Sequence, residues 1–166
     1  MKRFTHRHQP LPVFRAIPVA GLGACLAVLI LAALSEFGNL PMLAAPFGAT
    51  CVLLFTAHAS PLSQPINVVG GNLVAAAVGM LCQWIWPGSF VMDGVAVGFA
   101  IMAMMALRVV HPPAGALALV AYTSAKSWMF LLFPVFVGSV VLVGLAMVYH
   151  QVTQGQYPLS PPRKKT

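Results

Sequence analysis

The hexapeptide Arg108-Val109-Val110-His111-Pro112-Pro113 places polar chemistry inside an otherwise apolar stretch of the chain. Arg108 closes a long hydrophobic run, and an arginine at membrane depth is costly unless it is paired or functional. At the membrane interface, the same side chain would simply extend its charge into water. His111 has the chemistry to carry a proton, cap a helix or hold a structural hydrogen bond. These residue types predict either an intramembrane site or a structural break.

A second motif of the same form lies earlier in the chain. Pro46-Phe47-Gly48-Ala49 matches Pro113-Ala114-Gly115-Ala116 at an offset of 113 − 46 = 67 residues. Proline suits the first turn of a helix, so Pro46, Pro112 and Pro113 are expected to mark helix starts. Two such starts inside the protein would attract an anion through the helix dipole and through free N–H groups at Gly48, Ala49, Thr50, Gly115 and Ala116. The alternative is that these breaks serve only tight helix packing.

Two amides add polar groups to the next apolar segment, since Asn67 and Asn72 flank Gly70-Gly71. Such amides either bond across a helix interface or line a polar path. Catalytic chemistry has little support, because the two carboxylates lie at segment ends and no nucleophile, phosphate or dinucleotide motif is present. The histidines and cysteines lack metal-ligand spacing. We therefore expect no enzyme, no cofactor and no metal site.

The composition is that of an integral membrane protein. Hydrophobic residues make up 60% of the chain and charged residues 7%, far less charge than the surface of a soluble domain carries. The net charge is +7, and seven of the nine basic residues lie in the tails, residues 1–16 and 151–166. Basic tails that flank an apolar domain follow the positive-inside rule. We expect a lipid bilayer rather than nucleic acid as the partner, with both termini cytoplasmic in a bacterial inner membrane.

Six apolar segments make up the membrane domain, residues 17–150. Four are long, at residues 17–34, 65–86, 91–107 and 128–149, and two are short, at 42–57 and 112–122. The short ones are too brief to cross a hydrocarbon core of about 30 Å as straight helices. We predict an all-α polytopic bundle with four long spans and two short segments broken by proline and glycine.

The order long, short, long occurs twice, which predicts a two-fold internal repeat with halves 17–83 and 84–150. At the 67-residue offset, nine identical pairs fall between residues 46 and 80 and their counterparts. If the short segments cross the membrane completely, there are six crossings and the halves are inverted. If they re-enter, there are four crossings and the halves are parallel. Short, interrupted segments at corresponding places in two halves are typical of transporter sites.

The motif His111-Pro112-Pro113-Ala114-Gly115-Ala116 resembles the signature of the HPP family of small integral membrane proteins. Residues 46–50 and 60–72 are similar to its other motifs, and the resemblance runs from about residue 46 to residue 122. The family is described as having four transmembrane segments, and some members are associated with nitrite transport. The resemblance therefore implies a permease or channel for a small inorganic anion, nitrite or a similar species.

Two positions differ from the family pattern. The family often has arginine where this chain has Ile66, and histidine where it has Asn72. Arg108 and His111 are then the main internal positive groups, with Asn67 and Asn72 replacing hydration of the anion. A protomer of this size has little room to enclose a pathway, so we expect a homo-oligomer. The alternative function is a non-transporting membrane subunit that assembles through its small-residue faces.

Overall fold

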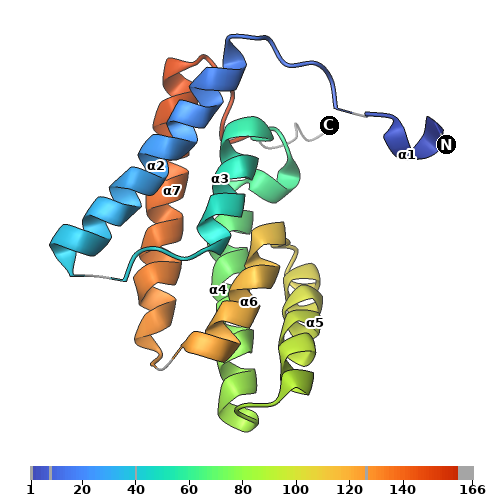
Figure 1. Ribbon diagram of the computed structural model, residues 1–166, viewed down its shortest axis with the longest axis vertical. Coiled ribbons are helices and arrows are strands. Elements are labelled where there is room, and N and C mark those ends of the chain that lie inside the picture. Colours follow the sequence, from blue (N-terminus) through green and yellow to red (C-terminus); the bar gives the residue numbers. More distant parts are fainter. Residues whose placement is uncertain (1, 8, 40, 126, 161–166) are drawn as a thin grey trace, which may run out of the picture.

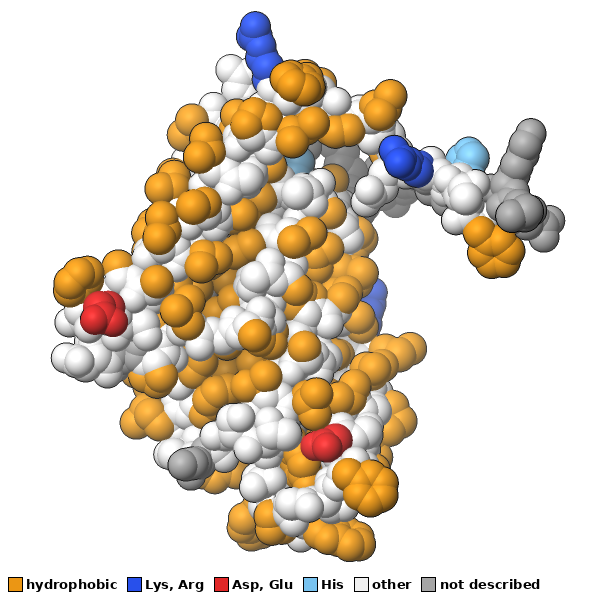
Figure 2. Space-filling view, viewed as in Figure 1, with side chains coloured by type: hydrophobic (Ala, Val, Ile, Leu, Met, Phe, Trp, Pro, Cys, Tyr) orange, Lys and Arg blue, Asp and Glu red, His pale blue; other side chains and the backbone are white. Residues whose placement is uncertain are grey.

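The computed structural model describes residues 2–7, 9–39, 41–125 and 127–160, and in these ranges it contains helices and no strands. The helices are α1 Lys2–Thr5, α2 Ala16–Gly38, α3 Pro46–Thr56, α4 Pro65–Ile85, α5 Phe90–Ala106, α6 Pro112–Ser124 and α7 Val137–Val152 (Figure 1). A short 3-10 turn, Pro61–Ser63, precedes α4, and a wide helical segment, Leu131–Phe136, leads into α7. Hydrophobic side chains cover much of the face shown in Figure 2, as expected for a protein surrounded by lipid.

Proline sets where the short helices begin. Pro46 and Pro112 occupy the first positions of α3 and α6, where a missing N–H breaks no helical hydrogen bond. Both helices begin well inside the bundle and run toward opposite ends of its long axis (Figure 1). The predicted short segments are thus confirmed as helices of 11 and 13 residues.

Among the residues that the structure describes, three helical segments are long and apolar enough to cross a membrane: Ala16–Gly38, Pro65–Ile85 and Leu131–Val152. The prediction of four long spans is wrong for residues 91–107. There α5 has 17 residues, a rise of about 26 Å that falls short of a hydrocarbon core of about 30 Å.

The end of α5 explains its length. Arg108 adopts a left-handed backbone conformation with φ 60°. Its N–H donates to the Met105 carbonyl at 3.1 Å, and the Val109 N–H donates to the Met104 carbonyl at 2.9 Å. This pattern closes a helix by satisfying its last carbonyl groups. Arg108 is therefore the residue at which the helix stops.

The centre of the bundle is formed by α4, which contacts α5, α6 and α7. Its neighbour α6 approaches so closely that a Cβ at Gly79 would overlap the backbone carbonyl of Ala118. Alanines fill much of this interface, including Ala75, Ala114 and Ala118, which are all fully buried. Small side chains let the two helix backbones approach this closely. Such close van der Waals packing is what holds helices together in a membrane, because lipid is as apolar as the side chains.

The start of α2 and the end of α7 lie at the same end of the bundle (Figure 1). Beyond α7 the chain folds back over the loop before α4. The Tyr157 hydroxyl donates to the Ser63 carbonyl at 2.9 Å, and the Leu159 N–H donates to Gln64 Oε1 at 2.9 Å. The basic residues at positions 163–165 of the predicted C-terminal tail lie outside the described residues.

Tyr157→Phe is expected to lower the unfolding temperature by about 2–4 °C, because it removes one buried hydrogen bond worth about 1 kcal/mol. Thermal unfolding in detergent measures the shift. Tyr149→Phe is the matched control, since the described contacts of Tyr149 are ring contacts with Phe55 and His150 that phenylalanine keeps. Equal unfolding temperatures for the two variants would contradict an anchoring role for Tyr157.

Candidate functional site

The two short helices meet at His111. The residue precedes Pro112 at the start of α6, and its ring is fully buried. Its Nδ1 lies 2.9 Å from the Leu62 carbonyl oxygen, and its Nε2 lies 3.0 Å from the hydroxyl oxygen of Thr50 in the first turns of α3. One imidazole thus joins α3, α6 and the loop before α4. We call this group of three residues, His111, Thr50 and Leu62, the histidine joint.

The histidine joint accommodates two protonation states. A carbonyl oxygen only accepts, so Nδ1 of His111 carries the hydrogen that it donates to Leu62. In a neutral ring, Nε2 accepts from the Thr50 hydroxyl. In a protonated ring, Nε2 donates to that oxygen, and the hydroxyl hydrogen turns to the Pro46 carbonyl, which lies 3.3 Å away. The ring can therefore gain or release a proton without losing a hydrogen bond.

The start of α3 offers no free backbone donors. The Gly48 N–H donates to the Ala45 carbonyl at 3.1 Å. Ala45 already has helical angles, φ −51° and ψ −39°, so the chain enters α3 through a turn that uses this donor. The N–H groups of Ala49 and Thr50 fall within the regular helical pattern. The expectation that these three residues present free N–H groups is wrong.

The start of α6 also offers no free backbone donors, but for a different reason. Two consecutive prolines open the helix and have no N–H to offer. The next donor, the Ala114 N–H, bonds to the His111 carbonyl at 2.9 Å, and the N–H groups of Gly115 and Ala116 lie inside the helix. Both helix dipoles remain, but the anion site built from free donors at these residues does not form.

The small residues of the two motifs face outward rather than toward the histidine joint. Gly48, Ala49 and Ala116 are exposed, and Gly115 is half-buried. A Cβ at either glycine would meet no atom within 4 Å. These positions therefore form accessible helix faces.

Arg108 lies away from the histidine joint, and its side chain is exposed. The residues after it pack against the first turns of α4: Asn67 Nδ2 donates to the Val110 carbonyl at 2.9 Å, and Val109 contacts Gly70. Arg108 is thus level with the beginning of α4 and lies four residues before the start of α6.

Asn72 is one of the fully buried polar side chains of the core. It is fully buried, and its Nδ2 donates to Ser139 Oγ of α7 at 2.9 Å. This bond confirms the interpretation of Asn72 as an amide that bonds across a helix interface. Its Oδ1 has no hydrogen-bond partner among the described residues. An unpaired buried acceptor costs about 1–3 kcal/mol, so it indicates a position where a donor is expected.

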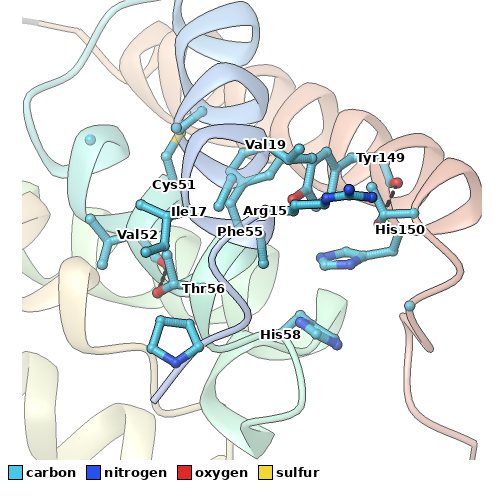
Figure 3. Close-up of a pocket in the computed structure, with 18 residues that line it drawn as sticks. Arg15, Ile17, Val19, Cys51, Val52, Phe55, Thr56, His58, Tyr149 and His150 are labelled. Atoms are coloured by element: carbon cyan, nitrogen blue, oxygen red, sulfur yellow. Dashed lines mark hydrogen bonds between the residues drawn. The ribbon is translucent and has the colours of Figure 1, made fainter. Parts of the chain in front are cut away.

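A pocket of about 820 Å³ lies between α2, α3 and α7 (Figure 3). His58 and His150 line it, with ring centroids 4.0 Å apart. His150 Nε2 donates to the Leu54 carbonyl at 2.8 Å, near the end of α3. Burial, followed by the neighbouring His150, lowers the pKa of His58 below its ordinary value.

Sequence reasoning missed this pocket and the contacts of the histidine joint. His58 and His150 are 150 − 58 = 92 residues apart, and no local spacing relates them. Leu62 contributes a backbone carbonyl, which no side-chain pattern reports. In the described ranges, no three His, Cys, Asp or Glu side chains gather in a way that could hold a metal ion.

Comparison with known proteins gives one family. Residues 9–158 match the family model described as the HPP transmembrane region. The chain is 33% identical over 122 residues to a transmembrane protein of Dictyostelium discoideum, a match that covers 68% of this chain and 39% of that protein. A second Dictyostelium transmembrane protein is 26% identical over 92% of this chain and 58% of its own length. The chain thus spans less than two thirds of these relatives, and no solved structure matches it significantly.

Proposed function

The chain belongs to the HPP transmembrane family, and we propose that it is a permease for a small inorganic anion such as nitrite, with a proton supplied at His111. The observation that carries this proposal is the contact between His111 and Thr50, 3.0 Å long and fully buried, at the meeting point of two short helices. Sites at broken helices inside the membrane are typical of secondary transporters. A buried histidine with two satisfied protonation states is suited to proton coupling.

An inverted internal repeat is part of this proposal, and contacts between the halves support it. A Cβ at Gly71 would lie 2.6 Å from the Val109 carbonyl oxygen, and one at Gly138 would lie 3.6 Å from the Met42 carbonyl oxygen. Gly71 and Gly138 occupy equivalent positions in the two halves, since 138 − 71 = 67. Met42 and Val109 do so as well, since 109 − 42 = 67. Equivalent glycines thus lie near equivalent carbonyl groups of the opposite half, although the ring of Phe47 lies nearer to Gly138.

A residue that lies on the two-fold axis between the two halves contacts the equivalent residue of the other half. Asn72 bonds to Ser139, and 139 − 72 = 67, so this hydrogen bond joins equivalent positions of the two halves. The opposite directions of α3 and α6 fit inverted halves with six crossings (Figure 1). Six crossings leave both termini on one side, and the basic tails support the cytoplasm of a bacterial cell as that side.

The polar groups favour a weak acid that crosses together with a proton. An anion faces little repulsion here, because the chain has only two acidic residues. Transfer of the proton from His111 Nε2 to nitrite would give neutral nitrous acid and a neutral imidazole, to which the Thr50 hydroxyl then donates. A neutral acid crosses an apolar core at lower cost than an anion. It also brings the hydrogen that the unpaired Asn72 Oδ1 lacks.

Nitrite uptake into proteoliposomes tests the coupling. We expect uptake by the wild type to rise with an inward proton gradient. His111→Asn keeps a donor for the Leu62 carbonyl but does not titrate, so its uptake should fall at least about tenfold, in line with the usual loss of a proton-transfer group. The remaining uptake should not depend on pH. His6→Asn, in the N-terminal segment, is the matched control.

Thr50→Val probes the other side of the same hydrogen bond. The change keeps the shape of the side chain and removes the hydroxyl that exchanges its hydrogen with His111. We expect reduced, proton-insensitive uptake, whereas Thr123→Val on the exposed face of α6 should behave as wild type. Wild-type uptake with an unchanged pH profile in both Thr50→Val and His111→Asn would contradict proton coupling at the histidine joint.

A non-transporting membrane subunit is the second candidate function, and the exposed small-residue faces favour it. Gly48, Ala49 and Ala116 leave room for close contact with another helix. The same faces would serve a homo-oligomer of the permease. The two functions differ in one measurement: purified protein that transports no anion, but co-purifies with one stoichiometric membrane partner, would support the subunit.

A further inference from the structure

The pocket between α2, α3 and α7 opens beside the first half of α2, whose residues are exposed or only partly buried. The buried residues of α2 are Ala27, at its centre, and Leu31, in its second half. In the first half, Ala20, Gly21 and Ala24 face the pocket, and a Cβ at Gly21 would meet no atom within 4 Å. The volume of about 820 Å³ falls within the range of roughly 300–1,000 Å³ that is usual for ligand sites.

The pocket is polar at one end and apolar along the rest of its length. Arg15 and His58 line it at the end of the bundle where α2 begins (Figure 3). Thr153, at the end of α7, lines the same end. From there it follows apolar and small side chains of α2 and α3 as far as Gly48, at the start of α3. An occupant that fills the whole pocket must therefore be amphipathic.

The charge at the polar end selects an anionic head group. Arg15 is exposed, and no acidic residue lines the pocket. The two carboxylates of the chain lie elsewhere, Glu36 in the last turn of α2 and Asp93 in the first turn of α5. A guanidinium presents a planar fork of donors that matches the oxygens of a phosphate. A free inorganic anion would use only this end and leave the apolar length unfilled.

We propose that this pocket binds one anionic phospholipid of the surrounding bilayer, with its phosphate at Arg15 and an acyl chain along α2 and α3. The polar end lies on the side of the chain termini, where basic residues attract the anionic lipids of the cytoplasmic leaflet. The lipid fills the gap beside α2 and holds that helix against α3 and α7. This site is separate from the histidine joint and does not depend on the proposed transport.

Binding of phosphatidylglycerol to the purified full-length protein in neutral detergent tests the proposal, with native mass spectrometry as the readout. Phosphatidylcholine with the same acyl chains should bind the wild type more weakly. Arg15→Gln should weaken phosphatidylglycerol binding about fivefold to tenfold, the effect of one basic residue near an anionic membrane surface. Arg7→Gln is the matched control, because Arg7 is exposed in the N-terminal segment and does not line the pocket.

Gly21→Leu is an independent test of the apolar part of the pocket. The position is open and lies in a regular helix, so a leucine fills the groove without disturbing the fold. We expect phosphatidylglycerol binding to fall as much as in Arg15→Gln, while the unfolding temperature without lipid is unchanged. Binding as in wild type by either variant would overturn the proposal. The proposal would also be overturned if inorganic phosphate competed for the pocket as effectively as phosphatidylglycerol, because the site would then bind a free anion.

Discussion

Replacing Gly79 with alanine is expected to lower the unfolding temperature by about 5–10 °C, which corresponds to about 2–3 kcal/mol of overpacking in a chain of this size. The added Cβ would overlap the backbone carbonyl of Ala118 and lie 3.0 Å from the Cβ of Ala121. A flexible side chain could rotate away from such a contact, but a helix backbone cannot. The whole of α6 must therefore move away from α4.

Gly144→Ala is the matched control for this change. Gly144 also lies in a helix, α7, but a Cβ there meets no atom within 4 Å. Alanine favours helix over glycine by up to about 1 kcal/mol, so this variant should unfold at the wild-type temperature or slightly above it. Thermal unfolding in detergent measures both. Equal stability of the two variants would contradict the close packing of α4 and α6.

Local signals in the sequence were sufficient to locate most helices. Proline at the first position marks the starts of α3, α4 and α6, and the apolar runs mark α2, α4 and the segment that ends in α7. The segment at residues 91–107 was predicted as a long span, but its helix, α5, has 17 residues and ends where the backbone turns at Arg108. A left-handed arginine leaves no signature in a hydropathy pattern.

The candidate site could be predicted only in part, because its bonds are long-range. Thr50 and His111 are 61 residues apart, and Asn72 and Ser139 are 67 apart. The sequence could suggest that proline starts two related short helices, but not which atoms meet there. It also could not show that the N–H of Gly48 is used by the turn before it. Donor use depends on the conformation of the preceding residues, which composition does not determine.

His111→Ala is expected to cost about 3–5 kcal/mol of folding free energy, because it opens a cavity and leaves buried polar groups without partners. The change removes a fully buried ring that bonds to the Leu62 carbonyl and the Thr50 hydroxyl. Unfolding in detergent should therefore begin about 10 °C or more below wild type. Thr123→Ala, on the exposed face of α6, is the control and should unfold close to the wild-type temperature.

His111→Asn separates the structural role of the histidine from its role in transport. The asparagine amide replaces the Nδ1 donor to Leu62, so we expect it to recover part of the stability lost in His111→Ala. It does not replace Nε2, which faces Thr50 and is the atom that exchanges a proton. A folded His111→Asn protein with slow, pH-independent uptake would show that the second nitrogen serves proton transfer. Uptake and stability equal to wild type would leave that nitrogen without a function.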